Sequence, residues 1–91
     1  ALPTATSIEY QSLLANTAQQ AKRYDLTISA YKQLTQLQPT KGKWWLGLAI
    51  AYDSDGQFTQ ARETYQQALA QGSLSQSAIT FIQQRLGELG E

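Results

Sequence analysis

The sequence repeats its pattern of apolar residues at an offset of 34 positions, which limits the folds open to the chain. The matched pairs are Leu14 and Leu48, Ala15 and Ala49, Tyr24 and Phe58, Tyr31 and Tyr65, Leu34 and Ala68, and Leu48 and Ile82. A fixed period of about 20–50 residues is typical of proteins that stack one structural unit on the next. The sequence therefore predicts an array of repeats.

Each unit has the periodicity of helices, because its apolar residues recur every three or four positions. No stretch alternates apolar and polar residues as a strand does, so we expect an all-α fold. We expect Pro39 and Gly72 to end the second and fourth helices, since proline cannot continue a helix and glycine favours its end. Five helices are predicted, at about 8–22, 25–38, 42–54, 58–71 and from Ser73 or Ser75 to Leu89.

Short signals predict where these helices begin and end. Thr6 followed by Glu9 is a capping-box pattern, which places the start of the first helix there. Asp25 and Thr40 are expected to cap the second and third helices, because short polar side chains accept hydrogen bonds from the first free N–H groups. Gly56 is expected to end the third helix in the left-handed conformation.

Residues 42–75 resemble the tetratricopeptide repeat family, whose period is 34 residues. The positions that match the family pattern are Trp45, Leu48, Ala49, Tyr52, Gly56, Ala61, Tyr65 and Ala68. The resemblance implies an α-solenoid with a lead-in at 1–7, a degenerate repeat at 8–41, a consensus repeat at 42–75 and a capping helix at 76–91. The first repeat departs from the pattern at Gln11, Ala18 and Lys22, and Ser73 replaces the closing proline.

Trp44 is an additional aromatic residue beside the consensus Trp45. We expect Trp44 to pack between repeats against Tyr31 or Leu34. The alternative is a half-exposed side chain that anchors a partner, since tryptophan is enriched among interface hot spots.

The composition excludes several classes of site. The 91 residues include seven basic and seven acidic residues and neither cysteine nor histidine. No basic face for nucleic acid is visible, and the usual metal ligands and nucleophile–base pairs are missing. Asp53 and Asp55 are interpreted as turn residues that bond their own backbone, not as a catalytic pair. We therefore expect no enzymatic activity, no cofactor and no bound metal.

In tetratricopeptide proteins the first helix of each repeat lines a concave groove that binds a partner segment. Carried over to this sequence, the groove residues are Glu9, Ser12, Asn16, Gln19 and Gln20, then Lys43, Leu46, Ile50, Asp53 and Ser54, and finally Ser77, Thr80 and Gln84. Leu46 and Ile50 stand four positions apart on one helix face, where they form an apolar strip with a polar rim. The alternative is that the capping helix covers both side chains as ordinary core.

The sequence therefore predicts a non-catalytic scaffold that binds a protein or peptide. The alternatives are a regulatory or substrate-recognition part of a larger enzyme, and a self-association module that forms a homodimer. No apolar run reaches the roughly 18 residues of a membrane span, so we expect this segment to make no direct membrane contact. The chain does not begin with methionine, so we expect an excised fragment or a processed product.

A second resemblance suggests a cellular setting. Several blocks are similar to the C-terminal domain of a biogenesis protein of the mannose-sensitive haemagglutinin pilus, a bacterial type IV pilus. These blocks are Trp44–Ala49, Tyr65–Leu69, Gly72–Ser75 and Gln84–Leu86. This resemblance implies a membrane anchor upstream, a periplasmic location and a role in assembling the pilus or another envelope complex. A cytoplasmic location is the alternative.

Overall fold

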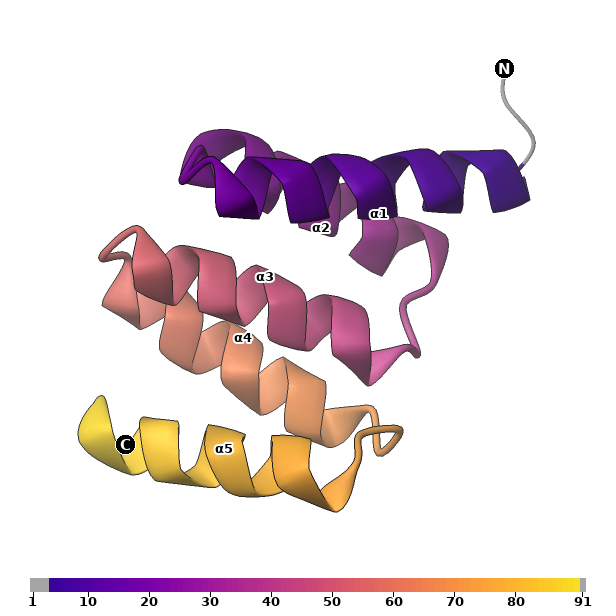
Figure 1. The fold of residues 1–91 in the computed structure, drawn as a ribbon. Helices are drawn as coiled ribbons and strands as arrows, with labels where there is room; N and C mark the ends of the chain where they lie inside the picture. The colour runs from indigo at the N-terminus through magenta and orange to yellow at the C-terminus, as the bar shows by residue number, and fades with distance from the viewer. Residues whose placement is uncertain (1–3, 91) are drawn as a thin grey trace.

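The computed structural model describes residues 4–90 and contains five helices connected by short turns (Figure 1). They are α1 (Thr4–Gln20), α2 (Tyr24–Leu37), α3 (Gly42–Ser54), α4 (Phe58–Ala70) and α5 (Gln76–Glu88). Within this described range there is no strand, so the prediction of an all-α, five-helix fold is confirmed. The helices follow one another through an elongated body of 41 × 27 × 19 Å, with α1 and α2 at one end and α5 at the other.

The start of α1 differs from the prediction. The helix begins at Thr4, so Thr6 lies inside it and the predicted cap at Thr6 is wrong. The expected lead-in is likewise helical at residues 4–7, while residues 1–3 lie outside the described part of the chain. Neither proline nor glycine occurs between Thr4 and Ser7, and nothing in that stretch stops the helix from extending.

The start of α2 is also shifted. Arg23 is the N-cap residue and Asp25, the expected cap, lies in the first turn. There the negative charge of Asp25 still stabilises the positive end of the helix dipole. Asp25 lies 3.7 Å from Arg23, but both side chains are exposed, so this ion pair contributes little. The helix ends at Leu37, two residues before Pro39, as expected.

Left-handed residues close the turns after α1, α3 and α4. Gly56 has a φ of +77° and Gly72 a φ of +69°, as expected for glycines that end helices. Lys22 adopts the same conformation, with a φ of +59°. Lys22 precedes Gly56 by 34 positions, so the degenerate first unit keeps the turn geometry even though it has lost the glycine.

Small residues allow the helices to approach closely. Ala49, Ala61 and Ala68 are fully buried between α3 and α4, and Tyr65 of α4 is buried beside them. Ile82 and Leu86 of α5 complete this cluster from the other side of α4. Trp45 and Tyr52 are half-buried, and both contact this cluster as well as a second one between α2 and α3.

The contact between α2 and α3 joins the two helical hairpins. Trp44 is only 9% exposed, and its ring lies 6.4 Å from that of Tyr31 between centroids, so the predicted packing against Tyr31 is confirmed. The indole N–H of Trp44 donates a 2.7 Å hydrogen bond to the Oε1 atom of Gln38. Gly47 lies against the same tyrosine, and a Cβ atom at Gly47 would overlap the Tyr31 ring. Trp44 therefore fills this interface, and the absence of a side chain at Gly47 leaves room for the Tyr31 ring.

Candidate partner-binding groove

The predicted groove residues lie on α1, α3 and α5, and none of them is fully buried. On α1, Glu9, Asn16 and Gln20 are exposed, while Ser12 and Gln19 are partly exposed. On α5, three polar positions of the set are exposed: Ser77, Thr80 and Gln84. The predicted groove positions on these two helices are polar, and Glu9 alone among them is charged.

The exposure of Leu46 and Ile50 is intermediate between the two alternatives that the sequence left open, an accessible strip and a covered core. Both side chains are half-buried and pack against the cluster that includes Tyr65, Ile82 and Leu86. They are therefore part of the edge of the core, and each still presents some surface to solvent. The cluster, to which α4 contributes Tyr65 and α5 contributes Ile82 and Leu86, covers part of the apolar strip and leaves the rest accessible.

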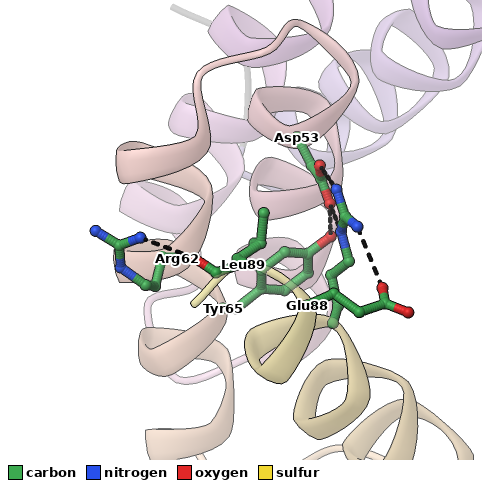
Figure 2. A network of polar contacts seen from close by, with 6 residues as sticks. Asp53, Arg62, Tyr65, Glu88 and Leu89 are labelled. Atoms are coloured by element: carbon green, nitrogen blue, oxygen red, sulfur yellow. Dashed lines mark hydrogen bonds and ion pairs between the residues drawn. The ribbon is translucent and has the colours of Figure 1, made fainter. Parts of the chain in front are cut away.

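Asp53 is engaged by its own chain. Its two carboxylate oxygens receive hydrogen bonds from Arg85 of α5, Oδ1 from Nη2 at 2.6 Å and Oδ2 from Nε at 2.7 Å. The Tyr65 hydroxyl of α4 donates to Oδ2 at 2.9 Å (Figure 2). The interpretation of Asp53 as a turn residue that bonds its own backbone is therefore wrong. We also leave it out of the proposed binding set, because both oxygens already have partners.

The network around Asp53 fixes α5 against α3 and α4. A bidentate arginine–carboxylate pair is directional and is among the stronger hydrogen-bonded contacts in proteins. Arg85 also donates from Nη1 to Glu88 at 3.2 Å, and Arg62 of α4 donates to the carbonyl of Leu89 at 3.2 Å (Figure 2). These polar contacts supplement the apolar contacts of Ile82 and Leu86.

The electrostatics of this network favour one charge state. The hydrogen bonds from Arg85, and secondarily that from Tyr65, hold the pKa of the Asp53 carboxyl below its usual value. Burial raises the pKa of the Tyr65 hydroxyl well above its usual value, and the neighbouring Asp53 carboxylate raises it further. Asp53 is therefore ionised and Tyr65 protonated over the physiological range, so this network is suited to holding helices together.

Sequence reasoning did not find the partners of Asp53. Arg85 is the basic residue of α5, 32 positions from Asp53, and no local pattern connects the two. The available signal was a single cation on a helix expected to cover the consensus repeat. A cation on a packed helix often pairs with a carboxylate on the helix beneath it, but only the packed structure selects which one.

A basic hollow lies at the start of α3. It has a volume of about 250 Å³ and is lined by Lys41, Gly42, Lys43 and Ser73. The N-cap of α3 is Lys41, so the predicted cap at Thr40 is wrong. Instead, the Gly42 N–H donates a 2.8 Å hydrogen bond to the Ser73 hydroxyl, which itself donates to the Thr40 carbonyl. Ser73, in the turn that follows α4, thus supplies the side-chain cap that Thr40 was expected to provide.

Lys43, a predicted groove residue, is exposed at the edge of this hollow. Its Nζ atom lies 4.5 Å from the centroid of the Trp44 ring. A lysine over an aromatic face is held by a weak cation–π attraction. Its charge therefore stays near the start of α3.

The tetratricopeptide repeat family model matches residues 18–79, which is more than half of the chain and runs from the end of α1 into α5. The chain belongs to the tetratricopeptide repeat family. Repeats of this family mediate protein–protein interaction and are typically non-catalytic. No curated protein gave a significant match.

The described helices also limit what else this tetratricopeptide domain presents. None of them is both long and apolar enough to cross a membrane. Residues 4–90 contain no group of three or more histidine, cysteine or acidic side chains placed to hold a metal ion.

Proposed function

We propose that this domain is a non-catalytic scaffold that binds a peptide or an amphipathic helix of a partner protein along α1, α3 and α5. The observation that carries the proposal is the apolar strip of Leu46 and Ile50, half-buried on α3, while the predicted groove positions on α1 and α5 are polar. A strip of this kind suits a segment that presents apolar side chains at helical spacing.

The flanking residues suggest the chemistry of the bound segment. Asn16 and Gln20 of α1 and Thr80 and Gln84 of α5 are exposed and uncharged. Amide and hydroxyl groups of this kind donate and accept hydrogen bonds without selecting a charge. The preferred segment is therefore one of low net charge, with one or two apolar anchors and polar groups on either side.

The first test uses peptides selected from a random 16-residue library displayed on phage, with affinities measured by fluorescence anisotropy. Leu46→Ala combined with Ile50→Ala should weaken the selected peptides at least tenfold. The control pair is Gln33→Ala with Glu63→Ala, which alters exposed positions on α2 and α4 and should leave affinity unchanged.

A second variant keeps the test decisive, because Leu46 and Ile50 also contact the core. Asn16→Ala with Gln20→Ala changes only exposed α1 side chains and should weaken the same peptides while circular dichroism stays native. If both variant pairs bind as the wild type does, or the library yields no binder, the groove proposal is wrong.

We further propose that the partner belongs to a bacterial envelope assembly, specifically the machinery that builds a type IV pilus in the periplasm. Support comes from the similarity of the Trp44–Ala49, Tyr65–Leu69, Gly72–Ser75 and Gln84–Leu86 blocks to a pilus-biogenesis domain. Deleting the gene should abolish or reduce surface pili in electron micrographs. Wild-type protein should restore them, and the Leu46→Ala, Ile50→Ala variant should not. Normal piliation after deletion would contradict this setting.

A further inference from the structure

The most exposed large apolar side chains lie on α1, beside the predicted groove. Tyr10 is 56% exposed and Leu13 is 67% exposed. Residues three positions apart on a helix lie on the same side, so Tyr10 and Leu13 form one apolar surface. Thr6 and Thr17 flank it and are also exposed. We call these four residues the α1 stacking face.

The 34-residue register identifies what kind of surface this is. Tyr10 corresponds to Trp44, and Leu13 corresponds to Gly47 and, one period later, to Phe81. Trp44 and Gly47 both pack on Tyr31 of α2. Phe81 of α5 packs on Tyr65 of α4, with ring centroids 6.1 Å apart.

Tyr31 and Tyr65 are themselves equivalent, because 34 positions separate them. On α3 both positions, and on α5 the position of Phe81, therefore contact an aromatic residue on the second helix of the preceding hairpin. The α1 stacking face is the same surface, and in residues 4–90 its two large side chains stay exposed. Equivalent surfaces on α3 and α5 form the contacts with the preceding hairpin in this fold.

The charges on α1 are compatible with contact between identical surfaces. The helix Thr4–Gln20 carries a single charged side chain, Glu9, which lies outside the stacking face. Two copies of α1 can therefore approach without bringing a row of like charges together. In an antiparallel arrangement Tyr10 of each copy lies opposite Leu13 of the other. This pair takes the place of the contact that Tyr31 of α2 makes with α3.

We propose that the α1 stacking face is a self-association surface, on which two copies of this chain pack α1 against α1 around a two-fold axis. Closed two-fold dimers are the commonest homo-oligomers, and their interfaces use the same patch on both subunits. A helix of this length is about 26 Å long and about 10 Å wide. The area of one helix face, taken as this length times this width, is well below the roughly 800 Å² per partner of a standard interface, so the dimer is weak.

The test is sedimentation velocity of the wild-type chain from about 1 µM to about 1 mM, a range chosen for a weak interface. The mass should rise with concentration from 10.1 kDa towards twice that value. Tyr10→Gln with Leu13→Gln should raise the dimer dissociation constant at least tenfold while circular dichroism stays native. The matched control is Leu26→Gln, which makes the same change at an exposed leucine on α2 and should leave the dimer intact.

Three results would overturn the proposal. The first is a monomer at every concentration, and the second is a dimer that the Tyr10, Leu13 double variant does not weaken. The third is a mass that grows past the dimer without limit, because open growth requires two different surfaces per copy instead of one shared patch. The peptide-binding test does not involve the stacking face, so each proposal can fail without the other.

Discussion

The left-handed turn at Lys22 gives the sharpest test of how the repeat register shapes this fold. Lys22 has a φ of +59° at the position equivalent to Gly56, which has a φ of +77°. Side chains with a Cβ atom are strained in this conformation, whereas glycine is not. Lys22→Gly should therefore stabilise the protein, and Gly56→Lys should destabilise it.

The magnitude follows from two opposing effects. A non-glycine residue in the left-handed region costs roughly 1–2 kcal/mol. Replacing Lys22 by glycine also costs roughly 0.5–1 kcal/mol of stability, because glycine loses more conformational freedom on folding than other residues do. The free energy of unfolding should thus rise by about 0.5–1 kcal/mol in Lys22→Gly and fall by a similar amount in Gly56→Lys. Nothing lies within 4 Å of a Cβ atom built at Gly56, so backbone strain is the main cause.

Urea denaturation followed by circular dichroism measures these changes, and thermal melting should show a Tm increase of about 3–6 °C for Lys22→Gly. Lys22→Ala is the control, because alanine removes the charge but keeps the Cβ atom and its strain. A stability gain in Lys22→Ala equal to that in Lys22→Gly would refute the reasoning, as would a Lys22→Gly variant no more stable than the wild type.

Four further predictions test other parts of the fold. Gly47→Ala should lower the free energy of unfolding by about 1–2 kcal/mol, through overlap with the facing ring of α2. Gly87 is also in a helix but has open space around it, so Gly87→Ala should raise the free energy of unfolding by about 0.5–1 kcal/mol. The pKa of Asp53 is lower in the folded protein than in the unfolded chain, where it is about 3.9. The ion pair with Arg85 therefore stabilises the fold fully above the unfolded pKa. This stabilisation is lost as the pH falls through the folded pKa. Asp53→Asn should therefore flatten the loss of stability seen in urea titrations between pH 5 and pH 2, and an unchanged slope would exclude this role. Trp45→Ala should lower the free energy of unfolding by about 3 kcal/mol, and a loss below about 1 kcal/mol would mean that Trp45 does not pack against the core.

The sequence predicted the parts of the fold that depend on local signals and on the repeat. The helix α3 has its predicted ends, and Ser75 caps α5 by accepting a hydrogen bond from the Ala78 N–H. Gly56 has the predicted left-handed backbone, and Gly72 ends α4 as predicted, because these requirements are local. Cap positions failed at Thr6 and Thr40, where a longer helix and a distant serine override the local pattern.

The candidate site was predictable only in part, since side-chain partners depend on how α5 is placed. Helical spacing and the family pattern located Leu46 and Ile50 on one face, but their half-burial depends on how far α5 extends over α3. The role of Asp53 was missed for the same reason. Its partner Arg85 is remote in sequence and comes close only after α5 has packed.

The most direct test of the proposed groove is to map a selected peptide onto the ¹⁵N-labelled protein by amide chemical-shift changes. We expect the largest changes to cluster at Asn16 and Gln20 on α1, Leu46 and Ile50 on α3 and Thr80 on α5. Changes concentrated on the exposed positions of α2 and α4, with those five amides unmoved, would contradict it.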